Sequence, residues 1–425
     1  MTLRSRGLRP RISILAALLA AHSPLAAQHA VTRTEAVRAA LEGGTRLALA
    51  RADSAAARAR LSSARALPNP SLAASYSKSA PQKHVSLEIP FDSPWSRGPR
   101  VRAASALARA AGLRLLSERA AAEMEADTTY TQALAADAHF RLSRQTAHDA
   151  DSLRVMATAR RNAGDASDLD VDLATVAAGQ QWNVASTDSL SYMSTVLTLQ
   201  TLMGLEPDSV TITLSDSLRL DGADAPGAVA PTRDASIVAG GSNPAGIGSP
   251  PSVVAAEASL QAAELALTRE RRSVLGLPAL SVGVEFGDPN GDEPGLLPVV
   301  GIVLPLPLFS RNQGPIAEAV AERTRARAEL VAARLEVRQR LVEGSLERAA
   351  LRVRVARDSG LVVMAQRVAA RSLTAYREGA AALPSVLEAR RSAREVLGQY
   401  IDDVASLLIV NAELRALTQT VPTAP

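Results

Sequence analysis

The chain has 425 residues, of which 47% are hydrophobic, 21% are charged and only 3% are aromatic. The formal net charge is +4, an excess too small and too scattered to indicate nucleic-acid binding. The chain contains no cysteine, which excludes disulfide frameworks, thiolate metal sites, thiol nucleophiles and an acyl anchor on an N-terminal cysteine. The hydrophobic surplus is mainly alanine, so the composition favours long helices that pack closely.

Residues 1–27 have the pattern of an export signal. Four arginines precede a hydrophobic stretch from Ile12 to Ala21, and residues 25–27 offer small side chains for cleavage. The stretch is too short to cross a bilayer as a helix. We therefore expect an exported protein whose mature chain begins near Gln28, the alternative being an ordinary buried helix at the N-terminus.

The mature chain contains one order of elements twice. Each half has a helical segment, two short segments of alternating polarity, a long helical tract and a turn that starts with glycine, Gly164 in the first half and Gly379 in the second. The residues between the halves are rich in Gly, Pro, Ser and Asp and lack periodicity, as linkers do. We expect a signal peptide at 1–27, a first repeat at 28–205, a linker or loosely folded lateral segment at 206–251, a second repeat at 252–418 and a tail at 419–425.

The helical segments have recognisable starts. Thr32 and Glu35 fit a capping box at the start of a helical segment that spans 31–66. The long tracts follow two strand-to-helix turns, Gly98-Pro99 and Gly314-Pro315, where a proline is tolerated because it lies in the first helical turn.

Both long tracts exclude a compact globule. They end near Arg161 and near Tyr376, so each would reach roughly 90 to 100 Å. In the second tract, hydrophobic or small residues recur every seven positions, which predicts a stripe that faces a partner helix. The stripe consists of Leu335, Val342, Ala349, Ala356, Val363 and Ala370.

Four short segments, at 71–78, 84–91, 280–286 and 299–306, are predicted to be strands, because hydrophobic residues alternate with polar or small ones. A barrel wall with lipid outside and water inside needs this alternation. Four strands are too few for the smallest membrane barrel, whereas two copies would give eight and three copies twelve, enough for a lumen. Two solvent-facing hairpins on a helical protein are the alternative.

Several runs of residues resemble TolC-type outer-membrane efflux proteins, and the likeness extends from about residue 31 to residue 418. It is carried by the runs at 32–37, 64–72, 96–99, 251–257 and 376–379. The resemblance implies a mainly α-helical protein with a small β part. Long antiparallel coiled-coil-like helices would form a trimeric α-barrel in the periplasm, and four strands per chain would contribute to a twelve-stranded transmembrane β-barrel. The implied partners are further copies of the chain, outer-membrane lipid, a periplasmic adaptor and, through it, an inner-membrane efflux pump.

Polar residues at the two hairpin tips are the candidate functional residues. The resemblance implies that an Asp-Val pair after the tip glycine lines the narrow end of the tunnel, and Asp170-Val171 matches it, whereas the second half has Ser385-Val386. Gly164 and Gly379 are the candidate adaptor-facing turns. The candidate tip and gate residues are Arg161, Asp165, Asp168, Asp170, Tyr376, Arg377 and Glu388. The alternative is that acids near a helix N-terminus only favour the helix dipole.

The sequence contains no motif for catalysis, cofactor binding or metal binding. It lacks a phosphate-binding loop, a nucleophile elbow and a dinucleotide fingerprint, and His139 and His148 lie nine residues apart, not at the i, i+4 spacing of a helical metal pair. We expect no enzyme activity, no cofactor, no metal and no nucleic-acid partner. The predicted function is an outer-membrane channel of a tripartite efflux or secretion system in a Gram-negative-type envelope. The alternative is an exported coiled-coil structural or adhesive protein without a pore.

Overall fold

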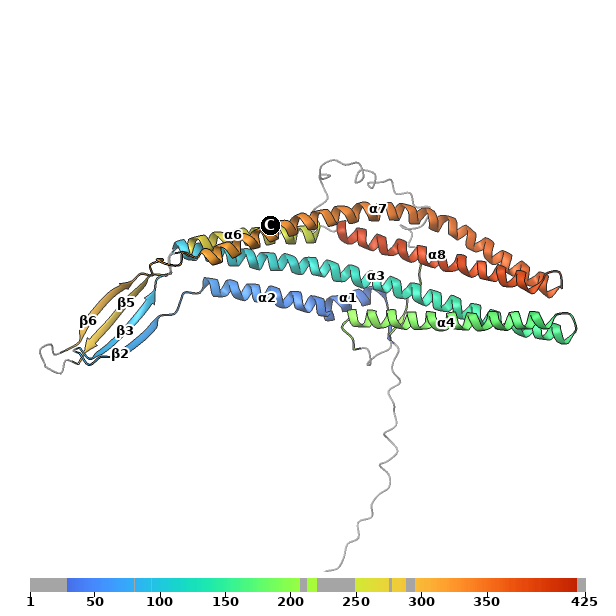
Figure 1. Cartoon of the computed structure of the whole chain (residues 1–425), viewed down its shortest axis with the longest axis horizontal. Helices are drawn as coiled ribbons and strands as arrows, with labels where there is room; N and C mark the ends of the chain where they lie inside the picture. Colours follow the sequence, from blue (N-terminus) through green and yellow to red (C-terminus); the bar gives the residue numbers. More distant parts are fainter. Residues whose placement is uncertain are drawn as a thin grey trace, which may run out of the picture.

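The computed structural model describes residues 29–79, 81–92, 94–206, 212–219, 249–274, 277–287 and 295–418. The expected signal peptide at 1–27, most of the segment at 206–251 and the tail at 419–425 lie outside these residues. The described chain is elongated, with a small sheet at one end and two helical hairpins that turn at the other end (Figure 1). It is mainly helical and has four antiparallel strands in this sheet, as predicted. None of the helices in these residues has the length and hydrophobicity of a membrane span.

The same order of elements occurs in both halves (Figure 1). The first half contains α2 (Thr45–Arg65), β2 (Ser71–Tyr76), β3 (Lys83–Pro90), α3 (Pro94–Asn162) and α4 (Asp168–Leu202). The second half contains α6 (Pro251–Arg272), β5 (Ala279–Phe286), β6 (Leu297–Val303), α7 (Gln313–Arg377) and α8 (Leu383–Thr418). The strands therefore lie where the alternation placed them, with ends that differ by at most three residues.

The helical segment expected at 31–66 is interrupted. The predicted capping box of Thr32 and Glu35 starts α1 (Arg33–Gly43), but this helix ends at Gly43, and α2 begins at Thr45. A Cβ atom on Gly43 would lie 2.9 Å from the carbonyl oxygen of Met203. The break thus lies at the Gly43-Gly44 pair, where α1 passes very close to the end of α4. The sequence shows the two glycines but not this contact.

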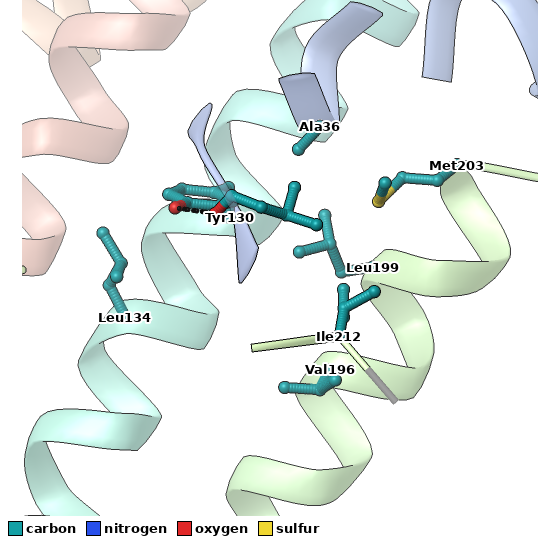
Figure 2. Close-up of a cluster of buried hydrophobic side chains, with 8 residues drawn as sticks. Ala36, Tyr130, Leu134, Val196, Leu199, Met203 and Ile212 are labelled. Carbon is teal, nitrogen blue, oxygen red and sulfur yellow. Dashed lines mark hydrogen bonds between the residues drawn. The ribbon is translucent and has the colours of Figure 1, made fainter. Parts of the chain in front are cut away.

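The segment at 206–251 is not only a linker, because part of it contributes to a buried hydrophobic cluster. Its strand β4 (Ile212–Leu214) pairs in parallel with β1 (His29–Val31). Ile212 packs with Tyr130 and Leu199 in a buried hydrophobic cluster (Figure 2). The hydroxyl of Tyr130 lies 2.9 Å from both the carbonyl oxygen of Val31 and Oδ2 of Asp216. Burial, reinforced by Asp216, raises the pKa of Tyr130 to about 12.

The main sheet has the strand order β2-β3-β5-β6, and all neighbours are antiparallel. Leu87 lies opposite Leu72 on one side and Val282 on the other, so hydrophobic residues share one face. On the other face, Nδ1 of His84 lies 3.1 Å from Oε1 of Glu285. The sheet therefore has one hydrophobic and one more polar face, which is the predicted pattern.

The two strand-to-helix turns differ from each other. In the first half α3 begins at Pro94, so Gly98 and Pro99 lie inside the helix and not at its start, contrary to the prediction. The added turn brings Arg97 and Arg100 within hydrogen-bonding distance of the last carbonyl groups of α2, at 3.2 Å and 3.1 Å, where cations are favoured. In the second half α7 begins at Gln313, so Gly314 and Pro315 lie in the first turn, as predicted.

The long helices lie in the order α4, α3, α8 and α7 across the molecule (Figure 1). Small residues permit close packing of α3 on α6, where Ala106, Ala110, Ala258 and Ala262 form a buried cluster. The predicted stripe of α7 does not face α8. Its members Leu335 and Val363 are 60% and 54% exposed, while α7 packs on α8 through other residues, among them Leu351 and Val355. A seven-residue repeat predicts a contact stripe but not whether its partner belongs to the same chain.

The interface between α7 and α8 contains a pair of buried acids. Asp358 and Asp403 are 4% and 2% exposed, and one carboxylate oxygen of each has no hydrogen-bond partner within the described residues. Nε of Arg357 donates to Asp358, and Nη2 of Arg354 lies 2.5 Å from Asp403. Burial raises the pKa of Asp403, and Asp358 acts in the same direction, whereas Gln399 and Arg354 oppose the shift.

Candidate functional site at the hairpin tips

Both hairpins turn at a glycine in the left-handed region of backbone space. Gly164 has φ of 85° and Gly379 has φ of 77°, a region that residues with a side chain rarely adopt. The N–H of Asp165 donates to the carbonyl oxygen of Arg160 at 2.9 Å, and the N–H of Ala380 donates to that of Ala375 at 2.8 Å. The two turns lie at the same end of the molecule, remote from the sheet (Figure 1).

A small hydrophobic core joins the two hairpins behind these turns. It contains residues from all four long helices: Leu153 and Ala157 of α3, Ala174 of α4, Tyr376 of α7, and Leu383 and Val386 of α8. Burial of these side chains favours the arrangement in which the hairpin tips lie together. The tips are therefore one packed unit and not two independent turns.

Arg160 connects the two hairpins by polar contacts. Its Nη1 donates to the carbonyl oxygen of Tyr376 at 2.5 Å, and its Nη2 donates to that of Asp165 at 3.4 Å. The guanidinium carbon lies 4.8 Å from the centroid of the Tyr376 ring, a cation–π distance. Arg160 could not be singled out from the sequence, because its partner Tyr376 lies 216 residues further along the chain.

Tyr376, which was predicted as a tip residue, is buried in this core. It is 3% exposed, and its hydroxyl group has no hydrogen-bond partner within the described residues. Burial raises the pKa of Tyr376, Arg160 opposes this shift, and Asp170 adds to it. The side chain thus anchors α7 to the other helices, and Arg160 covers its ring.

The predicted acidic residues are distributed over several interactions. The carboxylate of Asp170 accepts hydrogen bonds from the N–H and the hydroxyl of Ser167, at 3.1 Å and 2.9 Å, and so caps its own helix α4. Asp168 pairs with Nε of Arg161 at 2.7 Å. Asp165 and Glu388 are exposed, and Glu388 lies in the second turn of α8.

A groove of about 750 Å³ lies between α3, α4 and α8 behind the tips. Its apolar wall includes Leu173 and Val176, and its polar wall includes Arg390, Arg391 and Arg394 of α8. Burial lowers the pKa of Arg390, an effect that Asp149 opposes and that Arg377 increases. This groove could not be predicted from the sequence, because its walls combine residues from separate parts of the chain.

Comparisons with known proteins identify the fold. No protein-family model and no curated protein sequence matches the chain. Among solved structures, a membrane protein from Pseudomonas aeruginosa matches with 21% identity and a TM-score of 0.72, over 91% of this chain and 93% of that one. The outer membrane protein VceC from Vibrio cholerae has 17% identity and a TM-score of 0.69, over 91% and 96% of the two chains. The CmeC outer membrane channel of Campylobacter jejuni has 14% identity and a TM-score of 0.69, over 91% and 85%. The chain therefore has the fold of TolC-type outer-membrane channels.

Proposed function

We propose that the chain is the outer-membrane channel of a tripartite efflux or secretion system. Three copies would form a passive duct that docks on a periplasmic adaptor and, through it, on an inner-membrane pump. The proposal rests on one observation: within the described residues, the edge strands of the sheet and the outer helices each lack a neighbour on one side, and a second copy of the chain could supply it. The fold supports a location in the outer membrane, with the helices extending into the periplasm, because VceC and CmeC are outer-membrane proteins.

The first pair of open edges belongs to the sheet. Within the described residues, β2 and β6 each have a neighbour on one side only. Open strand edges carry unpaired N–H and C=O groups, which are costly in a membrane and prone to non-specific pairing in water. The hydrophobic face beside these edges is exposed, with Leu72 at 73% and Ile302 at 79%. Closure of three four-stranded sheets into one barrel of twelve strands would pair every edge.

The second pair of open edges belongs to the outer helices α4 and α7. Both expose hydrophobic side chains, for example Val176 and Leu190 on α4 and Val353 and Val368 on α7. Their net charges are opposite, since α4 contains four aspartates and no Lys or Arg, whereas α7 contains thirteen arginines and seven acids. We infer that α4 of one copy packs on α7 of the next, where the seven-residue stripe of α7 would find its partner.

Introduced cysteines test this packing, because the chain has none of its own. Leu190 is about as far from the tip on α4 as Val353 is on α7, so Leu190→Cys with Val353→Cys is expected to cross-link between copies into trimers. The matched control combines Leu190→Cys with Leu335→Cys, which lies roughly 27 Å further along α7 by helix rise. Equal cross-linking of both pairs, or none in either, would contradict the proposed contact.

Conductance separates a duct from the alternative, a coiled-coil structural or adhesive protein without a pore. Purified protein is expected to run as a trimer in detergent and to produce stepwise conductance in planar lipid bilayers. A stable trimer that never conducts under any applied voltage would favour the structural alternative.

We further propose that the tips, at 161–172 and 376–389, are the adaptor-facing and closable end of the duct. The helices place them roughly 100 Å from the sheet. On trimerisation, Asp170 and Glu388 would gather near one axis, create a negative potential and attract cations, with Arg161 and Arg377 offsetting part of it.

Selectivity measurements test this negative ring. Asp170→Asn with Glu388→Gln is expected to lower the cation selectivity of the conductance. The control is Ser167→Ala, which removes the capping hydroxyl of α4 but leaves every charge in place, so selectivity should stay. Unchanged selectivity in the double variant would remove the ring from the mechanism and leave the duct intact.

A further inference from the structure

The chain contains only two lysines, and both lie in one hairpin of the sheet. Every other basic side chain apart from histidine is arginine. Lys83 is the first residue of β3, and Lys78 lies in the turn that joins β2 to β3. Since β3 leads into α3, these residues lie at the end of the sheet that is farthest from the helices (Figure 1). Both side chains are exposed.

Lys83 lies on the hydrophobic face of the sheet, between two aromatic residues. Side chains alternate along a strand, so Lys83 shares its face with Val85 and Leu87. Lys83 pairs with Tyr76 of β2 on one side and with Phe286 of β5 on the other. Its Nζ atom lies 5.6 Å from the centroid of the Phe286 ring. A lysine stem on an apolar surface with its ammonium beside aromatic rings is the arrangement found where hydrocarbon meets head groups.

The helix-facing end of the sheet carries a second aromatic set but no lysine. Phe91, Trp95 and Phe309 are 57%, 52% and 96% exposed there. The eight residues of β3 between the two sets span about 26 Å, close to the height of the apolar band of membrane barrels. Nearby Arg97 and Arg100 bind Asp92 and the carbonyl groups that end α2. The ammonium groups of Lys78 and Lys83 thus lie at only one of the two boundaries of the apolar band.

We propose that Lys78 and Lys83 bind the phosphate groups of membrane lipids at the boundary farthest from the helices. This inference rests on the proposed function, because it requires the sheet to lie in a bilayer. An ammonium is a compact charge with three N–H donors on a flexible stem, which suits phosphate oxygens at varying positions. Three copies would place six ammonium groups around the barrel.

The competing use of these lysines is ion pairing within the protein. The residues between β5 and β6 include three acids, Asp288, Asp292 and Glu293. The hydrophobic face favours the lipid, because Lys83 lies among residues that would contact acyl chains. The two uses differ in their consequence, since ion pairs within the protein give no preference for any lipid.

Tryptophan quenching by brominated lipids tests the proposal on the full-length trimer in vesicles. The distal reporter is Tyr76→Trp in a background with Trp95→Phe and Trp182→Phe, and it lies directly opposite Lys83. The control reporter is the native Trp95 at the other end of the strands, with Trp182→Phe. Each reporter is measured with brominated phosphatidylcholine and with brominated phosphatidic acid, which has a phosphate head group.

The distal reporter should prefer phosphatidic acid by about fivefold or more, which corresponds to about 1 kcal/mol for each lysine near an anionic head group. Lys78→Gln with Lys83→Gln should abolish this preference and leave quenching at Trp95 unchanged, whereas Lys→Arg at both positions should retain it. Equal quenching by the two lipids at the distal reporter, or a preference that survives the glutamine variants, would overturn the inference alone. No quenching at either reporter would refute the membrane location and, with it, the inference.

Discussion

Replacement of Arg160 by methionine should weaken the connection between the two hairpin tips. Methionine keeps an unbranched apolar stem but removes the hydrogen bond to the carbonyl oxygen of Tyr376 and the cation over its ring. A hydrogen bond from a charged donor contributes about 1.5 to 3 kcal/mol, and a partly buried cation–π contact about 0.5 to 2 kcal/mol. Because both contacts belong to one side chain, we expect a joint loss of about 2 kcal/mol. Separation of the tips should become roughly 30-fold more frequent.

Amide hydrogen exchange measures the loss of stability at the tip, because the turn between α7 and α8 should fray more readily once Arg160 no longer holds Tyr376. The N–H of Ala380, which donates to Ala375 in the turn, should exchange roughly 30-fold faster in Arg160→Met. In planar bilayers the same variant should spend more time in its open conductance state. The control is Arg161→Met, which breaks an exposed ion pair with Asp168 within one hairpin and should cost less than about 1 kcal/mol. Similar exchange rates in the two variants would refute the assignment of Arg160 as the connection between the hairpins.

Three further predictions follow from the sheet, the buried acids and the N-terminus. Val284→Arg should lower the stability of membrane-inserted trimers by about 2 to 4 kcal/mol, whereas the same change at Glu285, on the other face, should be tolerated. Equal tolerance of the two changes in melting experiments would count against the barrel. The pKa of Asp403 is raised in the folded state, so at pH values between its ordinary and its raised pKa the folded state binds more protons than the unfolded chain. The free energy of unfolding should therefore fall as the pH rises through this range. In Asp403→Asn this fall should disappear from melting temperatures measured between about pH 4 and about pH 8, and an unchanged profile would assign it to other groups. N-terminal sequencing of outer-membrane fractions should place the mature start near Gln28, a prediction that retention of Met1 would contradict.

Turns and strands could be predicted from the sequence, because each depends on residues that are close together in the chain. Gly164 and Gly379 were identified as turns because a tight reversal after a long helix needs a residue that tolerates positive φ. The strands followed from alternation alone, since one face had to be hydrophobic. The helix start at Pro94 was missed because Pro99 satisfies the same first-turn rule five residues later.

Contacts between distant residues could not be predicted in this way. Arg160 has no feature that separates it from Arg161 in the sequence, and its role depends on the position of Tyr376 in the other half. The strand β4 has only three residues, too few to establish a period, so its place in the core was not visible. The seven-residue stripe of α7 was a real feature of the helix, but the direction in which it points depends on how α7 and α8 pack.

The pairing of β3 with β5 has a consequence for the order of folding. Val85 pairs with Val284, so the centre of the sheet cannot form until about two thirds of the chain has left the ribosome. The helical hairpins need only neighbouring segments, and contacts between neighbouring segments form much faster than distant ones. We therefore expect the hairpins α3–α4 and α7–α8 to form first, with β2–β3 and β5–β6 as separate ribbons. The joining of these ribbons would then be the slow step, so a helical intermediate with an incomplete sheet should accumulate during folding.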